Sequence, residues 1–172
     1  MAHKTLLHGD DVKKEIAHFD INGQDYEVLV SPNAVLSDFL REQLDLTGTK
    51  NACSAGECGS CTVLIDGKPA LSCCTLAMSV QGKKVVTIEG LGGKELHPLQ
   101  RAFIEKGSIQ CGFCTPGMIM TAAGLLNVNP SPSREEVIEG LGSNICRCTG
   151  YVKIVDAVMA AIEPAQEAHS DV

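Results

Sequence analysis

The chain has 172 residues, 44% of them hydrophobic, a formal net charge of −7 and only 3% aromatic residues, with no tryptophan. This length suits one ordinary domain or two small ones. Because the sequence has no basic stripe and no run of roughly 20 apolar residues, it predicts neither nucleic-acid binding nor a membrane span.

Nine cysteines are the most informative residues of the sequence. Small domains with few aromatic side chains are marginally stable alone, so we expect the cysteines to stabilise the fold through cross-links or bound metal. The charged first residues do not resemble a secretion signal, which favours a cytoplasmic protein. In a reducing cytosol, cysteines act as metal ligands or catalytic groups more often than they form disulfides.

The first half of the chain is typical of short strands with one helix. Residues 1–14 are predicted to form a loose polar extension. Asn22-Gly23 separates two runs rich in β-branched and aromatic residues, which predicts a hairpin with strands over 16–21 and 26–31. Residues 33–48 have leucines and a phenylalanine at helical spacing and predict a helix that ends at Gly48.

A second hairpin is predicted after the first cysteines, with its turn at Asp66-Gly67, and a further strand over 83–91. One helix lying across several short strands is an α+β pattern. We therefore predict a first domain over residues 1–90.

From residue 91 the pattern becomes helical. Thr115 is predicted to cap a helix with Pro116 at its first position, and Ser133 with Glu136 forms the pattern of a capping box. His97 precedes a proline at a helix start and is interpreted as a cap or a surface residue. Helices are predicted over 97–107, 115–127, 133–142 and 151–163, followed by a loose tail over 164–172. Four short helices with short connections suggest a small bundle, which we assign as a second domain over residues 91–172.

The first cysteine group has the spacing C-x4-C-x2-C, and eleven residues separate it from a fourth cysteine. This spacing matches the loop of a plant-type [2Fe–2S] cluster, and Gly56 and Gly59 would let the backbone fold closely around it. Structural zinc is the alternative, but zinc sites usually pair C-x2-C units. Of the adjacent Cys73 and Cys74, we assign Cys73 as the ligand and Cys74 as a small buried residue, because strand neighbours point to opposite faces. The predicted ligands are Cys53, Cys58, Cys61 and Cys73.

The second group combines a C-x2-C pair with a C-x-C pair, and 31 residues lie between the two pairs. Each pair precedes a predicted helix, so two helix N-termini are expected to face the same negatively charged centre. A C-x2-C pair alone is weak evidence, because zinc sites and thioredoxin-like redox pairs share it. A neighbouring cluster favours a second iron–sulfur centre. The predicted ligands are Cys111, Cys114, Cys146 and Cys148.

Three stretches, CSAGECGSCTVLIDGKPALSC, QCGFCTPGMIM and NICRCTGY, resemble the iron–sulfur subunit of the molybdenum hydroxylases. This family includes xanthine dehydrogenase, carbon monoxide dehydrogenase and 4-hydroxybenzoyl-CoA reductase. The resemblance covers about residues 15 to 163 and all eight ligand positions. It implies a β-grasp, plant-type ferredoxin-like domain followed by a four-helix bundle, with one [2Fe–2S] cluster in each.

The resemblance also implies an electron-transfer role within an oxidoreductase. A large partner subunit would hold the molybdenum–pterin cofactor and convert the substrate. Electrons would pass through the bundle cluster to the plant-type cluster and then to FAD on a further subunit, or in reverse in the reductases. Gln110 would hydrogen-bond the pterin, and Cys148 would be the ligand nearest to it. The assembly would be a hetero-oligomer such as a dimer of heterotrimers.

Other functions remain open at this point. A free two-cluster ferredoxin would be an acidic mobile carrier, and a zinc-stapled binding module would have no redox role. The sequence offers no paired carboxylates and no Ser–His–Asp arrangement, so no catalytic residue is assigned in this chain. If a partner covers the second cluster, we expect exposed apolar surface around it on the isolated chain.

Overall fold

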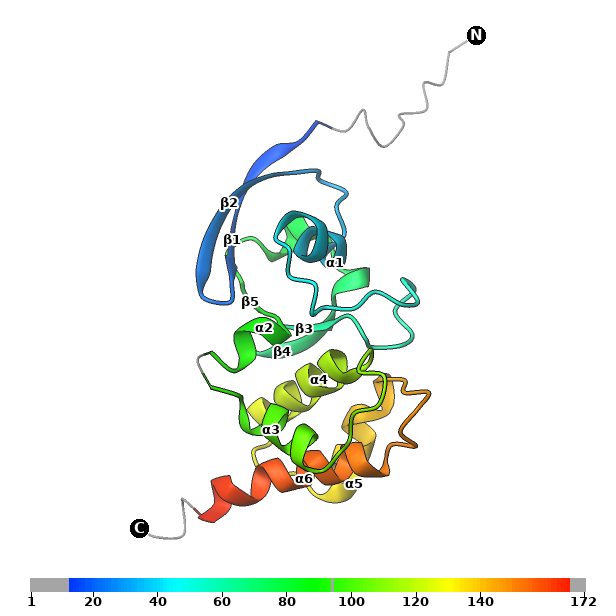
Figure 1. Cartoon of the computed structure of the whole chain (residues 1–172). Coiled ribbons are helices and arrows are strands. Elements are labelled where there is room, and N and C mark those ends of the chain that lie inside the picture. The colour runs from blue at the N-terminus through cyan, green and yellow to red at the C-terminus, as the bar shows by residue number, and fades with distance from the viewer. Residues whose placement is uncertain (1–12, 94, 168–172) are drawn as a thin grey trace.

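The computed structural model describes residues 13–93 and 95–167, with a sheet in the upper part of Figure 1 and a group of helices below it. Most of the two predicted loose ends, residues 1–12 and 168–172, lies outside the described residues. The last helix, α6 (Val152–Glu167), includes residues 164–167. None of the helices within the described part of the chain is long and apolar enough to cross a membrane.

Five strands form one mixed sheet in the order β2-β1-β5-β3-β4. The pairs β1–β2, β3–β4 and β3–β5 are antiparallel, whereas β1 and β5 are parallel. The sheet and the helices together make the predicted α+β fold. The strands are β1 (Glu15–Ile21), β2 (Gln24–Val30), β3 (Thr62–Ile65), β4 (Lys68–Leu71) and β5 (Lys84–Val86).

Both predicted hairpins are confirmed. The central turn residues all have positive φ, with 58° and 74° at Asn22 and Gly23 and 50° and 77° at Asp66 and Gly67. Two consecutive positive φ values match the twist of the flanking strands, which is why Asn-Gly and Asp-Gly are favoured there. The second hairpin returns the chain toward the first cysteine group.

The helix predicted over 33–48 is shorter than expected. It consists of α1 (Leu36–Asp38) and a π-helical turn, η2 (Phe39–Gln43). Asp45 then adopts a φ of 56°, and the backbone N–H of Leu46 donates to the carbonyl of Leu40 at 2.9 Å. A left-handed residue with such a return bond terminates a helix, so the predicted stop at Gly48 was wrong. The ring of Phe39 packs on Phe19 of the sheet with centroids 4.7 Å apart.

The strand predicted over 83–91 is also shorter than expected. Thr87 accepts a bond from the Asn22 side chain at 3.0 Å and its own backbone N–H donates to Asn22 Oδ1 at 2.8 Å. These contacts turn the chain away from the sheet, and α2 (Ile88–Leu91) begins directly afterwards.

One face of the sheet packs against α1 and η2. The opposite face is covered by α4 (Thr115–Val128), which contacts β3 and β4. Val63 and Leu64 of β3 are both buried, but Val63 belongs to the core under α1 and Leu64 to the core of the helices. Successive strand residues point to opposite faces, so one strand contributes to both cores. The other helices of this half are α3 (Pro98–Glu105), α5 (Arg134–Gly140) and α6.

The helix starts agree with the sequence in two cases and differ in one. The Ser133–Glu136 capping box of α5 is confirmed, and His97 caps α3 through Nδ1, which accepts from the Leu99 N–H at 3.2 Å. Thr115 was wrongly predicted as the cap of α4, because that helix already includes Thr115 and Cys114 occupies the capping position. The helix thus begins directly at a predicted metal ligand.

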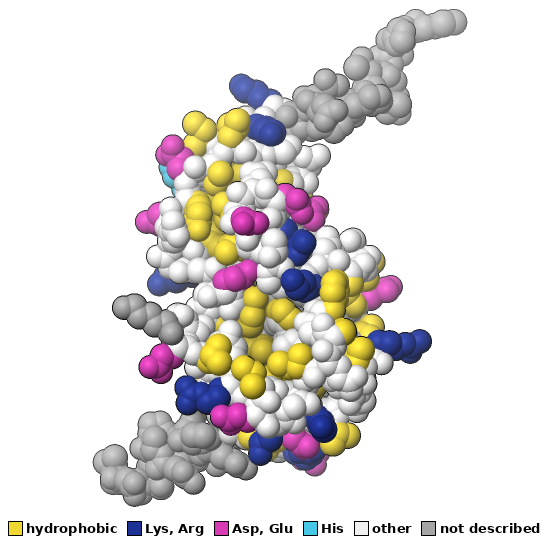
Figure 2. Space-filling view, in the orientation of Figure 1, with side chains coloured by type: hydrophobic (Ala, Val, Ile, Leu, Met, Phe, Trp, Pro, Cys, Tyr) yellow, Lys and Arg dark blue, Asp and Glu magenta, His cyan; other side chains and the backbone are white. Residues whose placement is uncertain are grey.

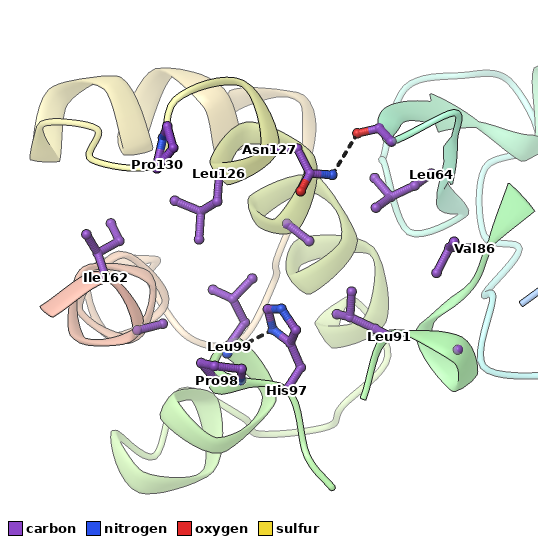
Figure 3. Close-up of a pocket in the computed structure, with 14 residues that line it drawn as sticks. Leu64, Val86, Leu91, His97, Pro98, Leu99, Leu126, Asn127, Pro130 and Ile162 are labelled. Atoms are coloured by element: carbon purple, nitrogen blue, oxygen red, sulfur yellow. Dashed lines mark hydrogen bonds between the residues drawn. The ribbon is translucent and has the colours of Figure 1, made fainter. Parts of the chain in front are cut away.

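A cavity of about 410 Å³ lies where the sheet meets the helices, and Figure 3 shows His97 and Leu99 at its wall. Asn127 of α4 donates to the Gly67 carbonyl of the second hairpin at 2.9 Å, which ties α4 to the sheet beside this cavity. Figure 2 shows hydrophobic side chains gathered over α2, α3 and α4 on this face. None of the described lining residues is a cysteine, so the cavity is separate from both cysteine groups.

Two candidate metal centres

The first three cysteines of the first group lie on a loop whose backbone folds around the sulfur of Cys53. The backbone N–H groups of Ala55 and Glu57 both donate to Cys53 Sγ at 3.4 Å. Gly56 and Gly59 have φ values of 77° and 68°, so glycine allows these turns without strain. The donated bonds lower the pKa of the Cys53 thiol to about 6, which favours the thiolate form that binds metal.

Cys61 and Cys73 of this group lie at the two ends of the β3–β4 hairpin. Cys61 lies directly before β3 and is buried, and its side chain contacts that of Cys73. The Ser72 hydroxyl donates to the Cys61 carbonyl at 2.7 Å and fixes the two segments together. Burial raises the pKa of Cys61 to about 11, so this thiol needs a bound cation to ionise near neutral pH. Cys53 and Cys58 form the other contacting pair.

Cys74 was wrongly predicted to be buried. Residues Ser72–Cys74 form a 3₁₀ turn, η3, in which successive side chains are rotated by about 120° rather than 180°. Cys74 is therefore on a side neighbouring that of Cys73 and is exposed, and the two Sγ atoms are 3.7 Å apart.

The second group is brought together by loops before α4 and α6. Cys111 and Cys148 are exposed, with Sγ atoms 3.6 Å apart, whereas Cys146 is buried and its side chain contacts Cys114. Burial raises the pKa of Cys114 to about 12, and neighbouring Cys146 adds to this. Cys114 lies at the N-terminus of α4 as expected, but three residues separate Cys148 from the start of α6. The N-terminus of α4 thus lies directly at the group, and the N-terminus of α6 lies one short loop away from it.

Hydrogen bonds shape the loop around Cys146. The backbone N–H and the hydroxyl of Thr149 lie 3.5 and 3.1 Å from Cys146 Sγ. Although burial acts to raise the pKa of Cys146, these donated bonds hold it below the ordinary value. The Cys146 N–H donates to the Tyr151 hydroxyl at 2.9 Å, and Tyr151 itself has a φ of 68°. Sequence reasoning missed Thr149 and Tyr151, since nothing in the cysteine spacing identifies such supports.

The two groups are neighbours joined by hydrogen bonds. The Ile145 N–H donates to the Cys58 carbonyl at 2.9 Å, and the buried Asn144 side chain donates to the Gly59 carbonyl at 2.9 Å. Gly117 of α4 also packs on the Gly59–Ser60 backbone without room for a Cβ atom. A cavity of about 220 Å³ is lined by Cys58 of the first group together with the four cysteines of the second.

The arrangement of the thiols fits two-iron clusters better than single ions. The thiols form contacting pairs, and a [2Fe–2S] cluster held by four cysteines requires two thiolates at each of two irons. A single zinc ion instead takes all four ligands around one centre. The pairs are Cys53 with Cys58, Cys61 with Cys73, Cys111 with Cys148, and Cys114 with Cys146.

Comparisons with known proteins agree with this geometry. A family model described as "2Fe-2S iron-sulfur cluster binding domain" matches residues 10–108, and one described as "[2Fe-2S] binding domain" matches residues 87–159. The chain is 50% identical over 140 residues to a Bacillus subtilis protein named as a probable xanthine dehydrogenase subunit, covering 81% of each chain. This chain belongs to the iron–sulfur subunits of the molybdenum hydroxylase family. Among other members, it is 45% identical over 154 residues to the "Nicotinate dehydrogenase small FeS subunit" of Eubacterium barkeri, covering 88% of this chain and 98% of that one.

A solved structure of the family has the same fold. A chain of quinoline 2-oxidoreductase from Pseudomonas putida 86 matches with a TM-score of 0.85 and 47% identity, over 90% of this chain and 98% of that chain. The aldehyde oxidoreductase of Megalodesulfovibrio gigas is 50% identical over 145 residues, which make up only 16% of its length. In that protein the matching segment is one part of a much longer chain.

Proposed function

We propose that this iron–sulfur subunit relays electrons between the molybdenum–pterin cofactor of a large subunit and FAD or an external carrier. Cys53, Cys58, Cys61 and Cys73 would hold one [2Fe–2S] cluster, and Cys111, Cys114, Cys146 and Cys148 a second. Each bound cluster supplies a one-electron redox centre whose potential depends on net charge, hydrogen bonds and solvent exposure. The relatives support this role, since several are named as small or FeS subunits of dehydrogenases and hydroxylases.

The observation that carries the proposal is the direct link between the two cysteine groups. The bond from the Ile145 N–H to the Cys58 carbonyl joins the residue before Cys146 to a predicted ligand of the other cluster. Only the backbone of these residues and one hydrogen bond separate the two sets of ligands. Neighbouring redox sites in one small chain favour a relay over two independent structural sites.

The chain's own residues would tune the two sites differently. The first loop offers backbone N–H groups to the half-buried Cys53, and these compensate the negative charge of its thiolate. In the second site, one contacting pair is shielded, with Cys146 buried and Cys114 half-buried. The other pair, Cys111 and Cys148, is exposed. Differences in exposure and hydrogen bonding give the two clusters different potentials.

We also propose that the exposed side of the second site faces the molybdenum cofactor. Cys148 lies on this side, and Gln110 is exposed next to Cys111. These positions support the predicted roles of Gln110 as a hydrogen-bonding partner of the pterin and of Cys148 as the ligand nearest to it. They require the large subunit to cover this part of the chain.

Exposed apolar side chains surround the same region, as the sequence led us to expect. Phe113 and Ile145 line the cavity at the second site, and Ile145 also lines a neighbouring cavity of about 400 Å³ with Ile138, Tyr151 and Val152. Exposed apolar patches of this kind mark protein–protein contacts. We name this patch the apolar docking surface; it consists of Phe113, Ile138, Ile145, Tyr151 and Val152, each 39–63% exposed.

The finer features of the architecture belong to the same proposal. The sheet order β2-β1-β5-β3-β4 with parallel central strands, crossed by α1, supports a β-grasp, ferredoxin-like first domain. Four helices around one core support a four-helix bundle, and the two cores support a division near residue 90. An FAD subunit, an assembly such as a dimer of heterotrimers and a cytoplasmic location stay predictions.

Native mass spectrometry of material purified through a tag on this chain tests the proposed function. We expect the chain to co-purify with a larger chain, and elemental analysis to find molybdenum in the same complex. A free-standing ferredoxin is the alternative, and it would appear as an isolated chain that keeps both clusters. That result would overturn the proposed role as a subunit.

A further inference from the structure

The first site contains one more thiol than a [2Fe–2S] cluster can bind. Cys74 Sγ lies 3.7 Å from Cys73 Sγ. This distance is close to the 3.6 Å between Cys111 and Cys148, which we assign to one iron of the second site. Cys74 Sγ is therefore close enough to Cys73 Sγ to reach the iron that Cys73 would bind.

Cys74 also contacts the loop that surrounds the cluster position. A Cβ atom added to Gly56 would lie 2.9 Å from Cys74 Sγ, so this sulfur packs against the backbone between Cys53 and Cys58. Gly56 leaves that approach open because it has no side chain. The thiol of Cys74 thus faces the first site.

The local backbone holds both cysteines in this position. The Thr75 hydroxyl donates to the Leu71 carbonyl at 2.9 Å, and the Thr75 N–H donates to the Ser72 carbonyl at 3.4 Å. In this 3₁₀ turn the two thiols lie on neighbouring rather than opposite sides. Exchanging one thiol for the other requires a side-chain rotation and a small shift of the turn, without refolding the strand.

We propose that Cys74 is a reserve ligand of the first cluster, an inference that rests on the proposed function. When the Cys73 thiolate is lost, Cys74 releases its proton to solvent and its sulfur binds the iron that Cys73 has left. One iron–sulfur bond replaces another, so the cluster keeps four thiolate ligands and its charge. Cys61 is buried, and the cysteine side chain that it contacts within the described residues is that of Cys73, which is itself an assigned ligand.

Four variants of the full chain in its purified complex test this inference: Cys73→Ala, Cys74→Ala, the double variant and Cys61→Ala. We expect about four irons per chain in the wild type and in both Cys73→Ala and Cys74→Ala, and about two in the double variant and in Cys61→Ala. The signal of the second cluster after reduction shows that each variant has folded. If Cys73→Ala loses the first cluster while the wild type keeps it, the inference is wrong although the proposed function stands.

Alkylation adds a readout that does not depend on cluster yield. With iodoacetamide under anaerobic conditions, we expect Cys74 to be labelled in the wild type and protected in Cys73→Ala, because iron then occupies its sulfur. Equal labelling in both proteins would overturn the inference. A wild type without the first cluster would overturn the proposed function and this inference together.

Discussion

Two asparagines make the same kind of bond in different surroundings. Asn144 and Asn127 each donate to a glycine carbonyl at 2.9 Å and each join the helical half to the sheet half. Asn144 is 3% exposed, whereas Asn127 is exposed to solvent. A buried carbonyl that loses its partner remains without a hydrogen bond, but an exposed one is hydrated by water.

We therefore predict that Asn144→Ala lowers the free energy of unfolding by roughly 1–3 kcal/mol, and that Asn127→Ala lowers it by less than about 1 kcal/mol. Anaerobic thermal melts of the two variants measure the difference. Since Asn144 also holds the loops of the two sites together, its variant should lose iron faster on dilution into a chelator. Equal effects of the two substitutions would contradict the assigned importance of burial.

Gly117 allows α4 to reach the first cysteine loop. A Cβ atom there would lie 2.9 Å from the Cα atom of Ser60 and closer still to the Gly59 carbonyl oxygen. We predict that Gly117→Ala destabilises the chain by about 1–3 kcal/mol, because backbone atoms cannot move aside as a flexible side chain can. Gly142→Ala is the matched control, since a Cβ atom at Gly142 meets nothing within 4 Å. The midpoints of thermal unfolding compare the two; a control that is as unstable as Gly117→Ala would refute the steric explanation.

At the level of elements, the cap of α3 depends on the protonation of a histidine. His97 Nδ1 accepts the Leu99 N–H, so a protonated ring cannot cap the helix. Burial holds the pKa of His97 below its ordinary value, so the unfolded chain binds a proton at a higher pH than the folded chain. The stability that His97 contributes is therefore present above about pH 6.5 and is lost as the pH falls toward the lowered folded value.

We predict that His97→Asn, which retains a cap but does not titrate, removes part of the decline in stability below about pH 6.5. The free energy of unfolding of the wild type and of His97→Asn, measured well above and well below that pH, tests this prediction. Because both proteins carry the same clusters, the difference between their stabilities does not contain the acid sensitivity of the clusters. A variant whose stability falls as steeply as that of the wild type would show that His97 does not carry the effect.

The helices and strands show which features of the fold could be predicted from the sequence and which could not. The hairpins at Asn22-Gly23 and Asp66-Gly67 were predictable because the turn chemistry is local. The early end of the first helix at Gln43 was not, because it depends on the conformation of Asp45 and a return bond to Leu40. The assignment of Leu64 to the helical core depends on which helix covers which face of the sheet, and no local pattern states that.

The candidate sites divide in the same way. Spacing alone predicted which eight cysteines to consider, and the structure brings them into two groups, the first of which also contains Cys74. Cys74 was misplaced because a 3₁₀ turn replaced the expected strand. The residues that join the two groups, Asn144 and Ile145, act through bonds to residues more than 80 positions away, so spacing along the chain could not reveal them.

At the scale of the whole molecule, the apolar docking surface predicts how the large subunit binds. We predict that Val152→Glu weakens binding of the large subunit at least about tenfold, equivalent to about 1.4 kcal/mol, because a charge would be buried in an apolar contact. Val128→Glu is the control, since Val128 is 74% exposed at the opposite end of α4 from Cys114. Quantitative pull-down of the large subunit compares them, with the iron content of each variant measured alongside. Equal loss in both variants would mean that the docking surface lies elsewhere.

The central claim is that eight cysteines hold two [2Fe–2S] clusters close enough to exchange electrons. Iron and acid-labile sulfide analysis of the purified chain, combined with electron paramagnetic resonance after dithionite reduction, tests it most directly. We predict about four irons and about four sulfides per chain, with two distinct signals from reduced [2Fe–2S] centres. A colourless protein that contains zinc, or one that gives no signal after reduction, would contradict it.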